Sequence, residues 1–385
     1  MKKSINITSI TLIIYMFFLV NIFYIPNFYE ILGSILFLEL VIYMITKKAN
    51  FRIDLQMLTP IFFAIYALLT GLIISINPTS FANGYLFVFQ GVVLFTLIYI
   101  SHSIVGVNYS RNILVALTVS ILLTSILFLV KPVVLSNGRM TIDGLNPNRL
   151  ADYLSFGIML LYLFSRQTKS VIYKIIFTTL LVMFFYAIIL TGTRKVIIGL
   201  IIFFITYRFF YYVLKVKIFQ SRAYKITTKS ITRTFIYLGL IIIGLFLISR
   251  YTDVFSRLFN EQAGDAERLY YYTEGLKVFL KNPLFGIGLN QFGELFDAYS
   301  HSTYIELLST TGLIGTLLFL SPLVTIYKIS FKRELVWTIG VLNYLIFTGF
   351  ANVYIYSLEF YIIISLMLYS LMLRKEDYFE NNILF

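Results

Sequence analysis

Cysteine is absent from this 385-residue chain, and charged side chains make up only 13% of it. The lack of cysteine excludes a disulfide framework, a thiol nucleophile and a thiolate metal site. An average soluble domain carries roughly 25% charged residues. Here 59% of the residues are hydrophobic, and a soluble globule cannot bury that much apolar surface. The composition therefore predicts a membrane protein.

The motifs of common soluble enzymes are also missing. There is no phosphate-binding glycine loop ending in Gly-Lys-Ser/Thr, no His-Glu-x-x-His and no Gly-x-Ser-x-Gly. No paired carboxylates suggest a metal, and we expect neither a metal nor a cofactor. The net charge of +13 is carried by short segments between apolar runs. That distribution is typical of membrane topology and argues against a nucleic-acid partner.

Long apolar runs are what the sequence has in abundance. A helix that crosses a bilayer needs about 20 apolar residues, or about 17 at the short end. The first run follows Lys2 and Lys3 but lacks a small-residue cleavage site, so we expect a span there and not a cleaved signal peptide. We predict an all-α, polytopic transmembrane helix bundle of about twelve spans, near residues 5–26, 30–46, 57–76, 84–101, 113–130, 150–165, 171–190, 196–213, 234–249, 304–327, 335–353 and 357–373.

Lysine and arginine set the expected orientation of these spans. With the N-terminus inside, 21 of the 31 lysines and arginines fall in the cytoplasmic segments, as the positive-inside rule requires. Both termini are then cytoplasmic. The predicted division is a bundle of nine spans over 1–249, a large extracytoplasmic loop over 250–303, and three more spans with a cytoplasmic tail over 304–385.

The loop over 250–303 is expected to be structured, because it is long and is not of low complexity. Asp265 can cap a helix over 266–281 that ends before Pro283, and Gly286 and Gly288 then shape a turn. Such a helix fits the outer surface of the membrane. Its apolar residues recur at helical spacing, at Leu269, Tyr272, Leu276 and Phe279/Leu280.

Two cations lie in a tight external link between two apolar spans, in the segment Thr191-Gly192-Thr193-Arg194-Lys195. Arg194 and Lys195 either snorkel to lipid phosphates or bind an anionic group presented at the membrane surface. A guanidinium suits the second role, because its fixed fork grips phosphate oxygens through two hydrogen bonds.

Three further polar residues belong to the outer face in this topology. Arg268 lies on the surface helix, where a solvated position is the simplest reading. His301 lies just before a span, where it is either structural or a base that meets an extracellular substrate. Glu306 follows one turn later, and it can orient that imidazole or favour the start of the helix.

Taken together, these segments resemble the O-antigen ligase/polymerase superfamily, which includes the Wzy polymerases and the WaaL ligases. The resemblance is concentrated between Arg268 and Gly315 and extends over about 140–320. The similar motifs are Asn146-Pro147-Asn148 before a span, Thr191-Gly192-Thr193-Arg194, Glu267-Arg268-Leu269, the turn Asn282-Pro283-Leu284-Phe285-Gly286-Ile287-Gly288-Leu289, the block His301-Ser302-Thr303-Tyr304-Ile305-Glu306-Leu307-Leu308 and Thr311-Gly312-Leu313-Ile314-Gly315. Two positions depart from the family pattern: Ser302 replaces an asparagine, and Lys195 replaces a small residue.

The resemblance implies an integral-membrane glycosyltransferase of the bacterial cytoplasmic (inner) membrane, with an extracytoplasmic active site. The donor would be an oligosaccharide on polyprenyl (undecaprenyl) diphosphate, and the acceptor a sugar hydroxyl. His301 would be the general base, and Arg194 and Arg268 would stabilise the diphosphate leaving group. A metal-independent, inverting displacement is expected. Further substrate contacts are expected from Lys195, Glu306, Asn148, Arg149 and Lys281.

Within the family we favour a polysaccharide polymerase, making capsule, O-antigen or exopolysaccharide, over a ligase that transfers finished glycan to a lipid core or a protein. A flippase for lipid-linked oligosaccharide stays open as a transporter, although the cations gather at the outer face and not in a central cavity. A rod-shape peptidoglycan glycosyltransferase does not suit the His301 block. The expected partners are membrane lipid, a flippase and a chain-length regulator.

Overall fold

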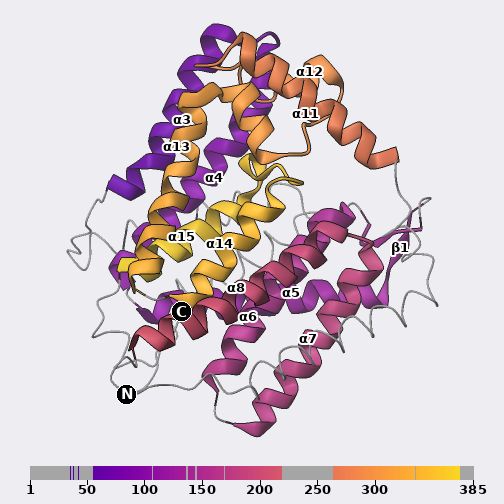
Figure 1. Cartoon of the computed structure of the whole chain (residues 1–385), viewed down its shortest axis with the longest axis vertical. Coiled ribbons are helices and arrows are strands. Elements are labelled where there is room, and N and C mark those ends of the chain that lie inside the picture. Colours follow the sequence, from indigo (N-terminus) through magenta and orange to yellow (C-terminus); the bar gives the residue numbers. More distant parts are fainter. Residues whose placement is uncertain are drawn as a thin grey trace. The chain divides into compact units, whose positions relative to one another are not determined.

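A computed structural model describes residues 55–105, 107–135, 138–143, 145–168, 170–218, 263–333 and 335–372, together with Ile35, Leu38 and Ile42, which are helical (Figure 1). Within these residues the protein has eleven α-helices, one 3-10 helix and one two-stranded hairpin. The expected all-α class is therefore confirmed. The spans predicted at 5–26, 30–46 and 234–249 lie outside the described residues, apart from those three helical positions.

The chain divides into two compact units, and each is described by itself. The first unit comprises residues Met1–Thr124 and Gly264–Phe385, and the second comprises Ser125–Ala263. One boundary between them falls inside helix α5 (Val107–Val130), and the other follows Ala263, the first residue of α11.

In the first unit, α4 packs along α15 and α3 packs along α13. The core between these helices is aromatic: Phe63 of α3 meets Phe319 of α13 edge to face, with 5.3 Å between the ring centroids. Gly91 of α4 gives room for the ring of Tyr361 on α15. The elements are α3 (Leu55–Ile74), α4 (Pro78–Val105), α11 (Ala263–Lys281), α12 (Gln291–Phe296), α13 (Thr303–Arg333), α14 (Val336–Thr348), η2 (Tyr354–Tyr356) and α15 (Leu358–Met372).

In the second unit, α6 packs along α7 and contacts α8. Asn146 caps α6 by accepting a hydrogen bond from the Asn148 amide at 2.8 Å, and Pro147 takes the first helical position. Gly192 ends α7 in the left-handed conformation that favours glycine. The elements are β1 (Val133–Val134), β2 (Met140–Thr141), α6 (Pro147–Gln167), α7 (Val171–Thr191) and α8 (Arg194–Ile218).

Three of the described helices are long and apolar enough to cross a membrane, at Pro78–Ile100, Val171–Thr191 and Thr303–Arg333, and shorter apolar helices lie at Leu58–Ile74, Leu114–Val130, Val336–Thr348 and Leu358–Met367. These segments coincide with predicted spans, but several predicted ends were wrong. The helix expected from 84 begins at Pro78, because the Asn77 side chain accepts hydrogen bonds from the amides of Thr79 and Ser80. The helix expected to end at 353 ends at Thr348.

Candidate functional site

Helix α13 is interrupted near its start. Gly312 has φ 63° and ψ −168°, which are not helical values. A break at membrane depth is tolerated only where other groups satisfy the freed backbone. The carbonyls before the break accept hydrogen bonds, Ser309 from the Ile287 amide at 3.0 Å, Thr310 from the Gly288 amide at 2.8 Å and Thr311 from the Tyr66 hydroxyl at 2.8 Å.

Beyond the break, the backbone of α13 also pairs with the turn over 283–288. The Leu313 amide donates to the Pro283 carbonyl at 2.8 Å, and the Ile314 amide donates to the Leu284 carbonyl at 3.4 Å. The segment 283–288 thus lies along the broken stretch of α13 and replaces its lost helical bonds. The motif over 282–289 and the motif over 311–315 are therefore joined by backbone hydrogen bonds.

Two glycines make this close crossing possible. A Cβ on Gly286 would lie 2.4 Å from the carbonyl carbon of Thr310, and a Cβ on Gly312 would lie 2.4 Å from the carbonyl carbon of Leu284. Both also have positive φ, 70° and 63°. Each position therefore requires glycine for its conformation and for its space.

Helix α12 and the turn before it are fixed to the loop between α3 and α4. Gln291 is fully buried, and its side chain pairs with both backbone groups of Asn77, accepting from the amide at 2.7 Å and donating to the carbonyl at 3.0 Å. Glu294 accepts a hydrogen bond from the Asn77 side chain at 2.8 Å. Figure 1 shows α11 and α12 at the end of the first unit where α3 turns into α4. Gln291 was not predicted from the sequence, because its partner Asn77 is 214 residues away in the chain.

The segment between α12 and α13 holds His301 in an uncommon conformation. Its φ is 58°, and the only other non-glycine residues with positive φ among those described are Asn290 (59°), directly before α12, and Asp297 (54°), directly after it. Strained backbone of this kind gathers at functional sites. The His301 side chain is exposed, and its ring lies 5.8 Å from that of Tyr271 on α11.

Glu306 fixes the turn that carries His301. Its side chain is fully buried. One carboxyl oxygen accepts a hydrogen bond from the Ser300 amide at 3.1 Å, and the other accepts from the Tyr356 hydroxyl at 3.4 Å. The predicted roles, to orient the imidazole or to favour the start of the helix, stay predictions. The contacts that the structure shows fix the backbone of Ser300, immediately before His301.

Tyr356 links this carboxyl group to a second loop. Its hydroxyl accepts a hydrogen bond from the Asn290 amide at 2.8 Å while donating to Glu306. Burial raises the pKa of Tyr356 well above its ordinary value, and the nearby Glu306 raises it further. Burial also raises the pKa of Tyr299, whose ring lies 6.0 Å from that of Tyr356. Tyr356 therefore keeps its proton and remains a donor to Glu306.

The surface helix exists as α11, but its start was predicted wrongly. The helix begins at Ala263, so Asp265 lies inside it and does not cap it. Its packed face is formed by Tyr271, Gly275 and Val278, which are buried. Three residues of the predicted apolar stripe face outward: Leu269, Leu276 and Leu280 are 66%, 44% and 73% exposed, whereas Tyr272 and Phe279 are half-buried. An outward apolar stripe is what a helix at a membrane surface needs.

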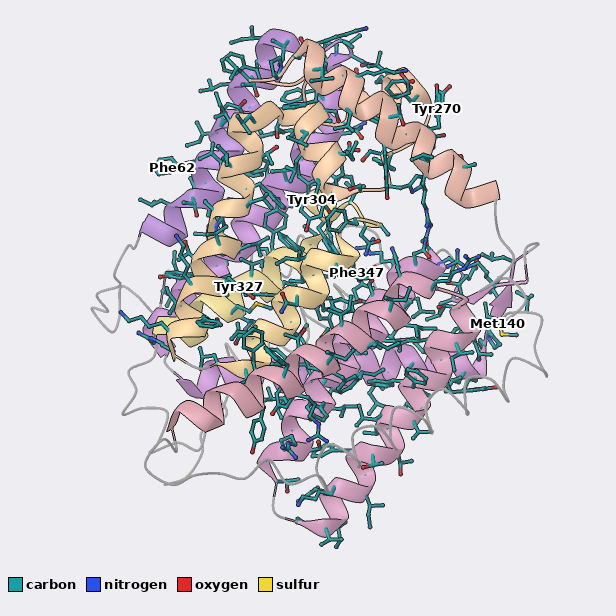
Figure 2. The ribbon with its side chains drawn as sticks, in the orientation of Figure 1. Phe62, Met140, Tyr270, Tyr304, Tyr327 and Phe347 are labelled. Carbon is teal, nitrogen blue, oxygen red and sulfur yellow. The ribbon has the colours of Figure 1, made fainter. Side chains whose placement is uncertain are left out.

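Arg268 and Lys281 both lie on α11. Arg268 is half-buried, next to Glu267, which accepts a hydrogen bond from the Tyr271 hydroxyl at 3.3 Å. Through Tyr271, the part of α11 that carries Arg268 contacts His301. Lys281 is exposed in the last turn, where a cation favours the helix dipole. Tyr270, exposed on the same helix, projects outward (Figure 2).

The second unit places Arg194 at the first residue of α8, directly after the Gly192 turn. Thr193 is buried, and its hydroxyl lies 3.3 Å from the Asn148 side-chain oxygen. The structure thus brings the Asn146-Pro147-Asn148 motif and the Thr191–Arg194 motif together, as two neighbouring loops of one unit.

The two other predicted residues of this unit have protein partners. Lys195 lies 3.8 Å from the Asp152 carboxylate, and both side chains are mostly buried. The charge that Lys195 adds to the family pattern is therefore balanced by Asp152. Arg149 donates to the Tyr153 hydroxyl at 3.1 Å, one turn along α6. A role for Lys195 or Arg149 in substrate binding stays a prediction.

Sequence reasoning missed Arg139, which precedes β2. Its guanidinium donates to the Thr191 carbonyl at 2.8 Å, to the Asn148 side-chain oxygen at 2.6 Å and to the Thr193 hydroxyl at 2.9 Å. Its position in segment 131–149, seven residues before Asn146-Pro147-Asn148, was the one available signal.

Among the residues that the structure describes, no three histidine, aspartate or glutamate side chains gather as metal ligands do.

Part of the chain matches a known protein family. The O-antigen ligase family matches residues 178–320. This range includes the Thr191–Lys195 turn, α11, α12, the 283–288 turn and the start of α13 up to Gly315. No curated protein matches the chain. The matched segment is similar to an O-antigen ligase domain, and members of that family are membrane glycosyltransferase-like enzymes. The family expected from the motifs is confirmed.

A glutamine at position 306 tests the buried network. Glu306→Gln keeps the size of the side chain but turns an amide donor toward either the Ser300 amide or the Tyr356 hydroxyl. A buried donor left unpaired costs about 1–3 kcal/mol. We expect a lower melting temperature and a slower transfer reaction, measured by thermal unfolding in detergent and by initial rates. Glu359→Gln is the matched control, because Glu359 accepts from Ser357 at the start of α15. Equal melting temperatures and rates for Glu306→Gln and wild type would contradict the assignment.

Proposed function

We propose that this protein is a polysaccharide polymerase of the bacterial cytoplasmic membrane. It transfers a glycan from polyprenyl diphosphate to a sugar hydroxyl of a second lipid-linked glycan, on the extracytoplasmic face. The observation that carries the proposal is the O-antigen ligase match over 178–320. The same range contains Arg194, Arg268 and His301, the three residues to which the sequence motifs gave catalytic roles.

The reaction is a single displacement at the anomeric carbon of the donor sugar. His301 takes the proton of the acceptor hydroxyl while that oxygen bonds to the anomeric carbon. The bond from the anomeric carbon to the diphosphate oxygen breaks, and polyprenyl diphosphate leaves with the electron pair. Attack from the face opposite the leaving group inverts the configuration.

Arg194 and Arg268 stabilise the charge that develops on the leaving diphosphate. Guanidinium groups are permanently charged and bind phosphate oxygens in fixed geometry. Stabilisation of this kind is greatest in the transition state, where the negative charge is largest. The two residues thereby take the place that a divalent cation holds in many other diphosphate-releasing enzymes, and we expect the reaction to survive chelation.

Glu306 and Tyr356 support the proposal through the backbone of the His301 turn. A base must be held within reach of the proton that it removes. The hydrogen bonds from Ser300 and Tyr356 to the Glu306 carboxyl group fix the residue before His301. The exposed His301 side chain is thereby presented from a rigid turn to an extracellular substrate.

The test is a reconstitution with defined substrates. Purified protein in nanodiscs receives a synthetic polyprenyl-diphosphate repeat unit, with or without a chelator, and products are resolved by length. We expect a ladder of lengthened glycan that is the same with chelator. A product that forms only when a separate lipid-core or protein acceptor is added would make the protein a ligase. Transbilayer movement of the lipid without any new glycosidic bond would make it a flippase.

A further inference from the structure

Arg139 lies at the centre of the second unit's loops, although no motif marks it. It directly precedes β2 in the hairpin Val133–Thr141, whose strands pair antiparallel. The hairpin is closed by backbone hydrogen bonds of 2.8 Å, from Leu135 to the Arg139 carbonyl and from Gly138 to the Leu135 carbonyl. The backbone of Arg139 is therefore fixed before its side chain makes any contact.

The guanidinium joins three segments that are separate in sequence. Its Nε donates to the Thr191 carbonyl at the end of α7, and one terminal nitrogen donates to Asn148 on α6 and to Thr193 before α8. These bonds are 2.6–2.9 Å long, which is the range of strong, charge-assisted hydrogen bonds. A positive group at the last carbonyls of α7 also favours the dipole of that helix.

The residues that Arg139 holds are neighbours of the proposed diphosphate ligands. Thr193 directly precedes Arg194, and Asn148 directly precedes Arg149. The Thr191 hydroxyl also donates to the Thr193 hydroxyl at 3.0 Å, so the first and last residues of the turn over 191–193 are bonded to each other. Gly192 gives this turn its shape but no rigidity of its own. The rigidity comes from Arg139.

We infer that Arg139 is a positioning residue, which sets the conformation of the Thr191–Thr193 turn and thereby presents Arg194 to the diphosphate. The inference rests on the proposed function. Arg139 itself need not touch the substrate, since its Nε and one terminal nitrogen are committed to protein acceptors. Lysine cannot replace it, because a single ammonium group lacks the planar fork that reaches three acceptors in these directions.

The experiment compares Arg139→Lys with wild type in nanodiscs, using a synthetic polyprenyl-diphosphate disaccharide as the probe. This substitution keeps the positive charge at position 139 but removes the hydrogen bonds that join Thr191, Asn148 and Thr193. We expect kcat/KM to fall on the order of 100-fold, as for other small misplacements of a catalytic group. Lys131→Gln removes an exposed cation from the start of the same hairpin and should leave the rate unchanged. Thr193→Val removes one acceptor without changing the shape, and it should lower kcat/KM in the same direction.

A double-mutant cycle separates positioning from direct binding. If Arg139 acts through Arg194, then Arg139→Lys should change the rate by less than about threefold when Arg194 is already lysine, because residues that act as one unit are not additive. A full, independent loss in the Arg194→Lys background would overturn the inference, and so would a wild-type rate for Arg139→Lys.

Hydrogen exchange supplies a readout that needs no activity. In Arg139→Lys we expect faster amide exchange over 189–195 than in wild type, with unchanged exchange in α13. Unchanged exchange over 189–195 would overturn the inference even if the wild-type protein formed no polymer. If the wild type forms no polymer but exchange over 189–195 is faster in Arg139→Lys, then the proposed function is contradicted and the positioning role of Arg139 is not.

Discussion

Replacing His301 with glycine is expected to abolish glycan transfer while leaving the fold intact. A general base contributes typically about 10²–10⁴-fold to a rate, and we expect a loss of that size in kcat/KM. Glycine is the informative replacement, because His301 has φ 58° and glycine adopts that conformation without strain. The measurement is the initial rate of polymer formation together with the melting temperature.

Two further variants make this prediction specific. Alanine at position 301 removes the same imidazole but adds backbone strain, so it should be as inactive as glycine and less stable. His102→Ala removes the other histidine of the chain, on α4, and should retain the wild-type rate. Retention of more than a tenth of the rate in His301→Gly would show that the imidazole is not the base.

Replacing Gly312 with alanine is expected to destabilise the protein more than any surface substitution. The added Cβ would lie 2.4 Å from the backbone of Leu284, and φ is 63°. Backbone with φ 63° and ψ −168° is essentially restricted to glycine and costs another residue on the order of 1–3 kcal/mol. The backbone overlap comes in addition, because neither segment can move without losing the hydrogen bonds between 283–288 and α13. We expect a large fall in melting temperature and in the yield of folded protein, with Gly286→Ala behaving alike.

Gly138 and Gly293 are the matched controls for this effect. Gly138 also has positive φ, 75°, but a Cβ there would meet nothing within 4 Å, so Gly138→Ala should show the conformational cost alone. Gly293 lies in α12 with open space around it, and its replacement by alanine should be nearly neutral. A melting temperature of Gly312→Ala equal to that of Gly138→Ala would show that α13 and the 283–288 turn are not in close contact.

Hydropathy and charge predicted the helices well, because each depends on a local run of residues. The helix ends were less predictable where a side chain or turn decides them. Asn77 moves the start of α4 to Pro78 by capping it, and the turn after Thr348 shortens α14. The break in α13 was not predicted from hydropathy, because the backbone groups that stabilise it lie in 283–288, distant from Gly312 in the chain.

The candidate site was predictable where a motif marked it and not elsewhere. His301, Arg268 and Arg194 were found because family-like motifs surround them. Arg139 was not found, because its partners Asn148 and Thr193 are 9 and 54 residues away. Glu306 was singled out because it lies one turn after His301. Its contacts with the Ser300 amide and with Tyr356 could not be predicted, because Tyr356 is 50 residues away in the chain.

The central claim is that one polypeptide polymerises lipid-linked glycan through His301, Arg268 and Arg194. The measurement that tests it most directly is the product ladder from a single polyprenyl-diphosphate repeat unit, made by wild type, by His301→Gly, Arg268→Ala and Arg194→Ala, and by His102→Ala as control. The account predicts a ladder for wild type and control, in the presence of chelator, and none for the three variants at equal amounts of folded protein. A ladder of wild-type length from any of the three, or its loss on chelation, would contradict the account.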